Sequence, residues 1–433
     1  MNISDSERIA GFLEKQGYKR TEKRQKADLV IMTTCGVRQK AEDRIYGLIP
    51  RIKKDNPAAK IILTGCLVNR LDVRKRLGEY VDLWMPINKI KNYKYQISNK
   101  LQISNFKTKN KLKFDNCGYL NIKPKYVSRF SALVPIGNGC NNFCSYCVVP
   151  YARGRETCRP AEEVIKEVKY LVKNGYKEII LIAQNVNSYK YNQNAANSAR
   201  ITGIKKNWDF SMLLKALNAI PGNFWIRFLT SHPRDMSAEL IKTVADCEKV
   251  CRHIHLPAQS GDNKILKKMN RKYTREHYFN LIKKIRKVMP DASVTTDIIV
   301  GFPGETKKQF ANTLKLFKEA RFDMAYISQY SPRFGTAAFK MDDSVPLGEK
   351  KKREKELDKV LKKSALENNK KYLGETEEVL FENKKGDRYF GKTKIGKKVE
   401  IIIKKGKYKI GDFAPVKILK AKEFGMKGKI VAR

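Results

Sequence analysis

Three cysteines stand close together near the middle of the chain. In the run NGCNNFCSYCVVPYARGR (138–155), Cys140, Cys144 and Cys147 fall within eight positions, and two arginines follow. With cysteine at about 2% of the residues, chance would give this CxxxCxxC spacing in roughly 0.4% of such chains. The spacing therefore indicates a site in which the three thiols act together, and a metal centre is the first candidate.

The number of thiols distinguishes two kinds of metal centre. A structural zinc ion needs four tetrahedral ligands, which Cys158 could complete, but no second CxxC or HxxxH follows within reach. A cubane 4Fe-4S cluster has four irons, and three cysteines on one loop would leave one iron open to another ligand. The spacing therefore favours a cluster with a reactive iron. Tyr146, between the second and third cysteines, would shield the cluster or stack on its ligand.

The composition places these thiols in a large, basic protein. A chain of 433 residues exceeds one ordinary hydrophobic core. No apolar run reaches the roughly 20 residues of a membrane helix, and the start, MNISDSERIA, has no secretion signal, so we expect a cytoplasmic protein with reduced cysteines. Lys+Arg 90 against Asp+Glu 44 gives a net charge of +46. This charge predicts a polyanionic partner, first of all nucleic acid, with a solvated basic surface as the alternative.

The elements that must carry the chemistry begin with an α/β pattern over residues 1–90. ADLVIMTTC (27–35) and AKIILTGC (59–66) are short apolar runs that follow charged amphipathic segments, as in an open parallel sheet. Each ends on a cysteine, Cys35 or Cys66, so both thiols would lie at the carboxyl edge of the sheet. Two buried, inert thiols are the alternative. The polar, lysine-rich residues 91–128, including Cys117, read as a linker.

A second alternation of strands and helices occupies residues 129–365 and predicts a partial parallel (β/α) barrel. The strands are expected at 131–137, 178–185, 224–231, 253–260, 294–301 and 324–330. Polar residues collect toward the ends of these strands and would face one rim: Gln184, Asn185, Ser231, His232, Gln259, Ser260, Asp297, Tyr330 and Arg333. Barrel enzymes place their chemistry at that rim, although any one of these residues could be a strand-end cap.

The last segment changes to short strands and glycine turns. After a charged helix at 347–371, residues 369–433 predict a small all-β barrel, with a hairpin across Lys385 and Gly386. Residues 370–433 hold 19 Lys or Arg and 8 Asp or Glu. Tyr389, Phe390 and Phe413 would be available to stack on bases. Cys247 and Cys251, one helical turn apart among apolar neighbours, are expected to pack in the core.

The motifs together resemble a known family. CNNFCSYC (140–147) is similar to the cluster motif of radical S-adenosylmethionine enzymes. LIAQNVNSY (181–189), TSHP (230–233), HLPAQSG (255–261), TTDIIVGFPGET (295–306) and YSPRFGT (330–336) resemble the methylthiotransferase branch. AQNVNSY and VVPYARGR most resemble the members that act on N6-isopentenyladenosine in tRNA. The resemblance covers nearly the whole chain, and residues 369–433 are similar to an RNA-binding TRAM domain.

The resemblance implies cofactors and roles for particular residues. Cys140, Cys144 and Cys147 would hold a 4Fe-4S cluster whose fourth iron binds S-adenosylmethionine, with Tyr146 beside it. Gln184 and Asn185 would lie near the methionine end of that cofactor, and Ser260, Asp297 and the turn from Gly301 to Glu305 near its adenosine. Tyr330 and Arg333 would face the same cavity. Arg153 and Arg155 would sit at the active-site mouth and recognise phosphate or base, with rim salt bridges as the alternative.

The resemblance also implies a second 4Fe-4S cluster held by three amino-terminal cysteines. Cys35 and Cys66 match two of them. Relatives place the third directly before a segment like MNISDSE (1–7), where this sequence begins with a methionine. We expect that the natural protein starts upstream and that a first strand is also missing here. The alternative is a compromised second cluster, because a cubane with two protein ligands should be labile.

The expected function is conversion of N6-isopentenyladenosine at position 37, next to the anticodon, into its 2-methylthio derivative. The expected partners are the tRNA anticodon stem-loop and an electron donor such as flavodoxin or ferredoxin, and we expect a monomer. Three alternatives stay open: a methylthiotransferase acting on N6-threonylcarbamoyladenosine, one acting on an aspartate of a ribosomal protein, and a non-catalytic RNA-binding protein that carries zinc or a cluster.

Overall fold

The computed structural model describes residues 1–37, 39–87, 118–192, 207–403 and 408–431, in two compact units. Unit 1 comprises Met1–Val127, Pro135–Arg159 and Ser331–Lys340, and unit 2 comprises Ser128–Val134, Pro160–Tyr330 and Met341–Arg433. Each unit is therefore assembled from three separate stretches of chain. This division follows packing, whereas the predicted domain boundaries follow the order of the sequence.

Unit 1 is built on a parallel three-stranded sheet with the order β1-β2-β3, as expected for residues 1–90. In β1 and β2 the register pairs Thr34 with Gly65, so both strands stop at the same edge of the sheet. Its helices and strands are α1 (Asn2–Lys15), β1 (Leu29–Thr34), α2 (Gln39–Asp55), β2 (Lys60–Gly65), α3 (Leu71–Leu77), β3 (Leu83–Trp84), β5 (Gly137–Asn138), α5 (Val149–Arg153) and β6 (Thr157–Cys158). Single turns lie at Arg24–Lys26, Gly118–Asn121 and Ala337–Lys340.

The sheet of unit 1 has an apolar cluster on each face. One cluster joins isoleucines of α2, such as Ile49, to Ile61 and Leu63 of β2. The other joins Ile9 and Phe12 of α1 to the sheet, and it includes Tyr119 and Leu120. These last two residues fall in the segment 91–128 that we expected to be a linker. The end of that segment is therefore part of the core, while its residues up to Cys117 lie outside the described residues.

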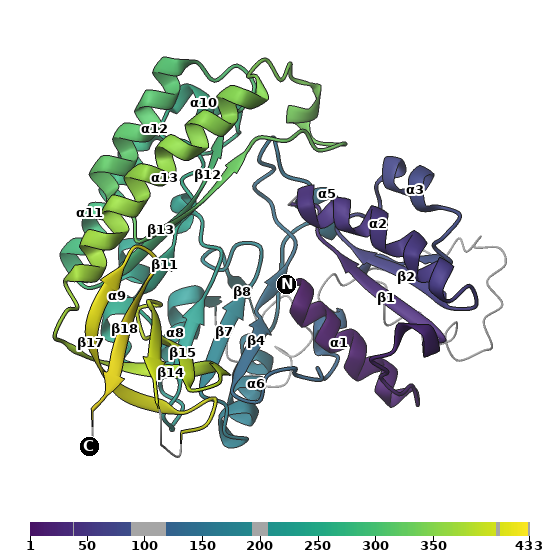
Figure 1. Ribbon diagram of the computed structural model, residues 1–433, viewed down its shortest axis with the longest axis horizontal. Coiled ribbons are helices and arrows are strands. Elements are labelled where there is room, and N and C mark those ends of the chain that lie inside the picture. Colours follow the sequence, from purple (N-terminus) through teal and green to yellow (C-terminus); the bar gives the residue numbers. More distant parts are fainter. Residues whose placement is uncertain (38, 88–117, 193–206, 404–407, 432–433) are drawn as a thin grey trace. The chain divides into compact units, whose positions relative to one another are not determined.

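Unit 2 contains two parallel three-stranded sheets, with the orders β10-β7-β4 and β11-β12-β13 (Figure 1). The strands are β4 (Ser131–Pro135), β7 (Glu178–Ile182), β10 (Trp225–Phe228), β11 (His253–His255), β12 (Ser293–Val300) and β13 (Met324–Gln329). The intervening elements are α6 (Ala161–Lys173), the hairpin of β8 (Lys190–Asn192) and β9 (Asn207–Asp209), α8 (Phe210–Asn218), a single turn at Pro233–Asp235, α9 (Ala238–Asp246), α10 (Asn263–Lys268), α11 (Arg275–Val288) and α12 (Lys307–Ala320). All six predicted strands are present, and most end a few residues earlier than expected.

Helix α12 of unit 2 is capped at both ends. Thr306 and Gln309 form a reciprocal capping box at the start of α12, and Arg321 ends that helix in a left-handed conformation. The long helix α13 (Leu347–Lys370) matches the predicted charged helix. Helices α11, α12 and α13 pack side by side along the β11-β12-β13 sheet (Figure 1). Cys247 and Cys251 are buried, as expected.

The carboxy-terminal segment of unit 2 is a closed five-stranded barrel, as predicted. Its strand order is β14-β15-β16-β18-β17, with β14 (Thr376–Lys385), β15 (Arg388–Thr393), β16 (Lys398–Ile402), β17 (Phe413–Lys422) and β18 (Gly425–Ile430). Apolar side chains that alternate along the strands, such as Val379, Phe381 and Ile401, fill its interior. The hairpin turns at Gly386, whose φ of 59° needs a residue that tolerates the left-handed region.

The barrel is joined to the parallel strands by specific contacts. Phe413 lies against Trp225 of β10, with 4.7 Å between ring centroids. Tyr389 is buried in the barrel core and donates a hydrogen bond to the carbonyl of Tyr408. The expectation that Tyr389 is free to stack on bases is therefore wrong, because its ring is buried, whereas Phe413 is half-buried against Trp225. Phe390 is 36% exposed and stays available.

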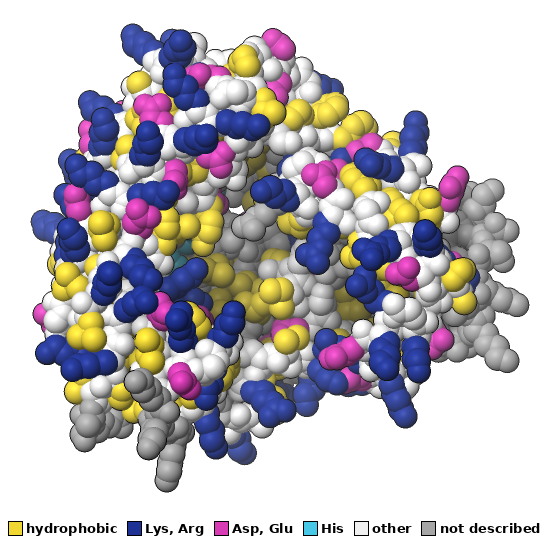
Figure 2. Space-filling view, viewed as in Figure 1, with side chains coloured by type: hydrophobic (Ala, Val, Ile, Leu, Met, Phe, Trp, Pro, Cys, Tyr) yellow, Lys and Arg dark blue, Asp and Glu magenta, His cyan; other side chains and the backbone are white. Residues whose placement is uncertain are grey.

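Basic side chains are spread over the surface of both units. Figure 2 shows Lys and Arg side chains across the whole visible face, with Asp and Glu interspersed among them. Within the described residues, no helix combines the length and the apolar character that crossing a membrane requires.

Candidate active site

The three central thiols lie on a loop of unit 1 whose backbone is shaped by unusual torsions. Gly139 has a φ of 80°, and a Cβ atom at this position would collide with the carbonyl oxygen of Arg155. The Cys140 amide donates to the Gly154 carbonyl at 3.2 Å, which closes the loop. Phe143 has a φ of 46°, an uncommon conformation for a residue with a side chain. Residues 139–155 therefore form a tight cradle.

Burial and the neighbouring thiols raise the pKa values of Cys140 and Cys147. Burial raises the pKa of Cys147 to about 12, with smaller contributions in the same direction from Cys144, Cys140 and Cys66. Burial also raises the pKa of Cys140, and Cys144 adds to the effect. The Asn142 side-chain amide donates to Cys140 Sγ at 3.5 Å. A metal centre would have to displace the thiol protons on binding.

Cys35 and Cys66 follow directly on β1 and β2 and lie together at the edge of the sheet. The Cys66 amide donates to the Thr34 carbonyl at 3.0 Å. A Cβ atom placed on Gly36 would lie 3.3 Å from Cys66 Cβ and 2.9 Å from Val148 Cγ2. Since Val148 follows Cys147, the loops of the two thiol sets are in contact within unit 1.

The donor set of unit 1 fits iron–sulfur chemistry. Sulfur is the preferred ligand of iron–sulfur clusters, and the central loop presents three thiols within one backbone cradle. Tyr146 stands between Cys144 and Cys147 and is half-buried. Within the part of the chain that is described, no three His, Cys, Asp or Glu side chains surround a point that could hold a single metal ion. The cysteines of a cubane bind different irons, so they need not meet at one point.

The two arginines that follow the thiol loop have different surroundings. Arg153 is 3% exposed and donates to Asp5 Oδ2 at 2.6 Å and to Asn138 Oδ1 at 3.1 Å. Its expected place at the active-site mouth is therefore corrected, because buried partners already hold its guanidinium. Arg155 is exposed, with its guanidinium carbon 4.9 Å from the centroid of the Phe143 ring. The Arg155 side chain is therefore accessible to solvent.

Arg333 also differs from expectation. It belongs to unit 1, whereas Tyr330 belongs to unit 2. Arg333 is 7% exposed; its side chain donates to the Val37 carbonyl at 3.1 Å and to the Gln39 side chain, and it lies 3.6 Å from Glu42. Arg333 is therefore held by the loop that follows Cys35, whereas we expected it to face a cavity together with Tyr330.

In unit 2, polar atoms without partners lie just beyond the ends of β7 and β10. Gln184 Oε1, Asn185 Oδ1 and Ser231 Oγ are buried and have no hydrogen-bond partner among the described residues. Asn185 is oriented by donating its amide to Asp235 Oδ2 at 2.7 Å. A buried polar atom that lacks a partner is costly, and a bound ligand is one way to satisfy it. These atoms therefore suit a polar ligand such as an amino-acid moiety.

His232, beside Ser231, is held as a neutral ring. Its backbone amide donates to Asn187 Oδ1 at 2.8 Å, and its Nδ1 accepts from the Arg234 amide at 3.2 Å. Burial lowers the pKa of His232 to about 3, and the nearby charge of Arg271 acts in the same direction. The polar edge of unit 2 thus contains a histidine that does not become charged at physiological pH.

Ser260 and Asp297 lie on the second sheet of unit 2. Ser260 is buried after Gln259, whose φ is 69°, and its hydroxyl accepts from the Asp262 amide at 3.2 Å. Asp297 lies within β12, before the strand ends, and its Oδ2 is 3.4 Å from His255 Nε2. The Asp297 side chain is 38% exposed, so it remains open to a ligand.

The turn after β12 is held by a buried ion pair. Gly301 has a φ of 67°, and its amide donates to Glu305 Oε2 at 2.7 Å. Arg353 Nη1 lies 2.7 Å from the same oxygen. Burial raises the pKa of Glu305, while the Gly301 amide and Arg353 oppose the change. The Glu305 side chain therefore holds the turn by accepting a hydrogen bond from the backbone amide of Gly301.

Tyr330 and Lys350 cover the other side of this turn. Tyr330 is 5% exposed and packs on Phe302, with 5.2 Å between ring centroids. Lys350 Nζ donates to the Tyr330 carbonyl at 3.3 Å and to Asp343 at 2.7 Å. Sequence reasoning missed Lys350 and Arg353. The pair Glu349 and Arg353, four residues apart on α13, was the available signal for the second.

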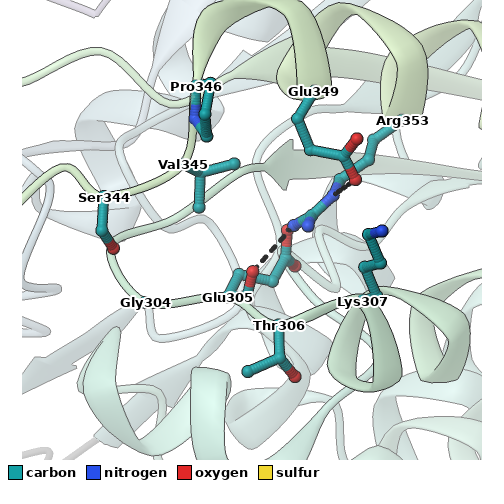
Figure 3. Close-up of a pocket in the computed structure, with 9 residues that line it drawn as sticks. All are labelled: Gly304, Glu305, Thr306, Lys307, Ser344, Val345, Pro346, Glu349 and Arg353. Carbon is teal, nitrogen blue, oxygen red and sulfur yellow. Dashed lines mark hydrogen bonds and ion pairs between the residues drawn. The ribbon is translucent and has the colours of Figure 1, made fainter.

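A pocket of about 470 Å³ opens beside this turn (Figure 3). Figure 3 shows Arg353 reaching between Glu305 and Glu349, with the start of α12 below. The pocket is lined by Gly304, Glu305, Thr306, Lys307, Ser344, Val345, Pro346, Glu349 and Arg353. Arg353 is already paired with both carboxylates.

Comparisons with known proteins agree with the motifs. The family model described as Radical SAM superfamily matches residues 134–317, the one described as Uncharacterized protein family UPF0004 matches residues 1–85, and the TRAM domain model matches residues 370–431.

A protein named tRNA-2-methylthio-N(6)-dimethylallyladenosine synthase from Clostridium botulinum strain Hall is 42% identical over 439 residues, covering 99% of this chain and 94% of the relative. A protein of the same name from Thermoanaerobacter pseudethanolicus is 41% identical and covers 100% of this chain and 90% of that protein. Among solved structures, the radical S-adenosylmethionine methyltransferase TsrM from Kitasatospora setae is similar with a TM-score of 0.49 and 14% identity, covering 77% of this chain and 68% of that one.

The three-thiol loop, the parallel strands and the matched models together define a radical S-adenosylmethionine enzyme, a class that uses a 4Fe-4S cluster and S-adenosylmethionine. Within this class the identity to the curated relatives is decisive. The chain belongs to the family of tRNA-2-methylthio-N(6)-dimethylallyladenosine synthases, which are methylthiotransferases and carry two clusters.

Proposed function

We propose that this chain inserts sulfur at carbon 2 of N6-isopentenyladenosine at position 37 of tRNA and methylates it, giving 2-methylthio-N6-isopentenyladenosine. The observation that carries the proposal is the 42% identity over 99% of the chain to a synthase named for this product. The three-thiol loop and the basic TRAM domain are consistent with it. We further propose that the protein works as a monomer in the cytoplasm, with flavodoxin or ferredoxin as the electron donor.

Each set of residues has a proposed role. Cys140, Cys144 and Cys147 would hold the cluster that binds S-adenosylmethionine, and Cys35 and Cys66 would contribute to the second cluster. When bound, the first cluster and S-adenosylmethionine supply a one-electron cleavage that yields methionine and a 5′-deoxyadenosyl radical.

The residues of unit 2 are proposed to orient the cofactor. Gln184 Oε1 and Asn185 Oδ1 would accept hydrogen bonds from the methionine amino group, since both atoms are buried and have no partner among the described residues. Ser260 and Asp297 would bind the adenosine. Tyr330 and the turn from Gly301 to Glu305 would close the site, with Glu305 acting through the turn.

The tRNA is proposed to contact two basic surfaces. Arg155 is exposed beside Phe143 and can bind a phosphate or stack on a base. The TRAM domain offers Phe390 and its excess of lysines for the anticodon stem-loop. These contacts would place the target adenosine for reaction.

The test is to express the protein anaerobically, reconstitute it with iron and sulfide, and supply S-adenosylmethionine, a reductant and tRNA that carries N6-isopentenyladenosine. We expect 5′-deoxyadenosine together with the methylthio nucleoside, both detected by mass spectrometry. Replacing Cys140, Cys144 and Cys147 with alanine should remove about four irons per chain and abolish both products. Replacing the buried core residue Cys247 with alanine is the control and should retain the iron.

The same experiment separates the alternatives. Iron-loaded protein that releases no 5′-deoxyadenosine would reject the proposal, and one zinc per chain would support the non-catalytic alternative. Nucleoside analysis of tRNA from a deletion strain, with and without this chain, distinguishes the isopentenyl from the threonylcarbamoyl substrate.

A further inference from the structure

We propose that Arg153 and Arg333 are positioning residues that fix the loop of Cys140, Cys144 and Cys147 against the loops that carry Cys35 and Cys66. The proposal goes beyond the reaction itself, and only its activity measurement rests on the proposed function. All the contacts that carry it lie within unit 1.

Arg153 makes the first connection. Its Nη2 donates to Asp5 Oδ2 at 2.6 Å and to Asn2 Oδ1 at 2.9 Å, both on α1, while its Nη1 donates to Asn138 Oδ1 at 3.1 Å. Arg153, Asp5 and Asn138 are 3%, 1% and 1% exposed. One guanidinium therefore joins the start of the thiol loop to α1 through three oriented hydrogen bonds, which its planar fork allows and a lysine ammonium could not reproduce.

The connection continues from α1 to the edge of the sheet. The Asn2 side-chain amide donates to the Thr34 carbonyl at 3.0 Å, and Thr34 Oγ1 donates to the Thr64 carbonyl at 2.6 Å. Thr34 precedes Cys35, and Thr64 lies two residues before Cys66. A chain of hydrogen bonds thus runs from Arg153 to the backbone beside both thiols.

The other end of the chain reaches the central loop. Asn138 lies two residues before Cys140, and its amide donates back to the Arg153 carbonyl at 3.4 Å. The next carbonyl, that of Gly154, accepts the Cys140 amide at 3.2 Å. Arg153 therefore stands where the loop closes, so its displacement would open the cradle.

Arg333 makes the second connection, through the segment Ser331–Lys340. Its Nη2 donates to the Val37 carbonyl at 3.1 Å, two residues after Cys35, and its Nη1 contacts the side chains of Gln39 and Glu42. Burial lowers the pKa of Arg333, and the opposing charge of Glu42 offsets part of the change. Arg333 thus ties this segment to the loop of Cys35.

The same segment also holds the central loop. The Ala338 amide donates to the Ser145 carbonyl at 2.7 Å, and Ser145 lies between Cys144 and Cys147. The segment Ser331–Lys340 therefore contacts both thiol sets. The loop of the three central cysteines and the loop of Cys35 are therefore connected twice, once through Arg153 and α1 and once through this segment.

A fixed spacing between the two thiol sets matters for a group transfer. A reaction that moves sulfur and a methyl group between two centres depends on their separation, and a misplacement of about 1 Å can cost on the order of 100-fold in rate. The buried guanidinium of Arg153 has its donors directed at internal oxygens. These features support a positioning role and not a substrate contact.

The first experiment uses the protein without clusters and measures hydrogen–deuterium exchange of the peptides covering residues 29–37 and 138–158. Arg153→Gln and Arg333→Gln should each raise exchange in both peptides. The control is Arg227→Gln, which breaks a buried Arg227–Glu178 pair of the same 2.6 Å length in unit 2 and should leave both peptides unchanged. If Arg153→Gln does not fold, the milder Asp5→Asn variant takes its place.

The second experiment uses the reconstituted enzyme and measures the ratio of 5′-deoxyadenosine released to methylthio nucleoside formed. Loss of spacing should raise this ratio about tenfold or more in Arg153→Gln and Arg333→Gln at normal iron content. Arg153→Lys should retain the ion pair with Asp5 and still show a raised ratio. Arg153→Gln tests the connection through α1, and Arg333→Gln independently tests the connection through the segment Ser331–Lys340.

The outcomes are distinguishable. Unchanged exchange at 138–158 in folded Arg153→Gln, or an unchanged product ratio in iron-loaded variants, would overturn the proposal. Absence of 5′-deoxyadenosine from the unmodified, iron-loaded protein would instead reject the proposed function, and the exchange measurement would still decide whether the two arginines position the loops.

Discussion

Arg353 Nη1 lies 2.7 Å from Glu305 Oε2, and the two side chains are 4% and 1% exposed. The same carboxylate accepts the amide of Gly301, so one buried pair fixes the turn after β12. Arg353 Nε also lies 2.9 Å from Glu349 Oε1, one turn earlier on α13, and the Glu349 side chain is 25% exposed. Mutation of Glu305 and mutation of Glu349 are therefore expected to lower the stability of the protein by different amounts.

Removing the fully buried carboxylate of Glu305 should cost more stability than removing the partly exposed carboxylate of Glu349. Glu305→Ala leaves a buried guanidinium without its main partner and should destabilise the protein by about 3 kcal/mol. Glu349→Ala, the matched control, removes a carboxylate that is partly exposed and leaves the Glu305 pair intact, so it should cost about 1 kcal/mol or less. Thermal unfolding of the protein without clusters measures both. Equal losses would show that Glu305 does not hold the turn.

Gly139 should be required for the thiol loop for a reason beyond its torsion angle. Gly139→Ala introduces a Cβ atom that collides with the Arg155 carbonyl, and we expect most of the iron of the central cluster to be lost. Gly175 has a nearly equal φ of 83° but open space around it, so Gly175→Ala isolates the torsional strain, about 1 kcal/mol. Iron analysis after reconstitution compares the two. Full loading of Gly139→Ala would contradict the cradle.

The neutral ring of His232 predicts a loss of stability in mild acid. Its pKa is about 3 in the folded protein, below the ordinary 6.5, so the unfolded chain binds a proton as the pH falls through 6.5 and the folded protein does not. Between pH 7.5 and pH 5.5 this should lower the free energy of unfolding by about 1.4 kcal/mol. His232→Asn keeps an acceptor for the Arg234 amide and should lack this component. Parallel pH dependence in the two proteins would refute the assignment.

Arg155 should act on tRNA and not on the cluster. Because its guanidinium is exposed beside Phe143, Arg155→Ala should raise the KM for tRNA about tenfold, equivalent to the loss of about 1.4 kcal/mol, while the iron content stays unchanged. Arg155→Lys should restore part of the affinity if the contact is a phosphate, and little if it is a stacked base. Steady-state kinetics at two salt concentrations would measure this. An unaltered KM would remove Arg155 from the interface.

The sequence was sufficient to predict the cysteine sites, because these sites depend on residues that are close together in the chain or that end neighbouring strands. Cys140, Cys144 and Cys147 are neighbours along the chain, and Cys35 and Cys66 end two strands that pair in register. It was insufficient for side chains whose partners lie far away in the sequence. The partner of Arg153 is 148 positions distant, and Arg333 meets Val37 across 296 positions. An arginine next to a motif has the same local pattern whether it faces solvent or a buried carboxylate.

Most strands of the two parallel sheets in unit 2 were predictable for the same reason, since β4, β7, β10, β12 and β13 are short and largely apolar. Tyr389 was misjudged because an aromatic residue in a small barrel can pack in the core or stack on a base, and the sequence pattern is the same in both cases. Only the three-dimensional structure shows which aromatic rings are buried in the core of the barrel. Phe390, which alternates with Tyr389 along β15, points the other way.

The assembly of unit 1 from distant stretches has a consequence for biosynthesis. Proteins emerge from the ribosome amino terminus first, yet Ser331–Lys340 is needed to complete the packing around both groups of cysteines. In the nascent polypeptide, Cys35 and Cys66 therefore lack part of their surrounding structure until more than three hundred residues have been translated. We therefore expect maturation with inorganic iron and sulfide to follow the synthesis of most of the chain, and an amino-terminal fragment cut at residue 127 should not reproduce it.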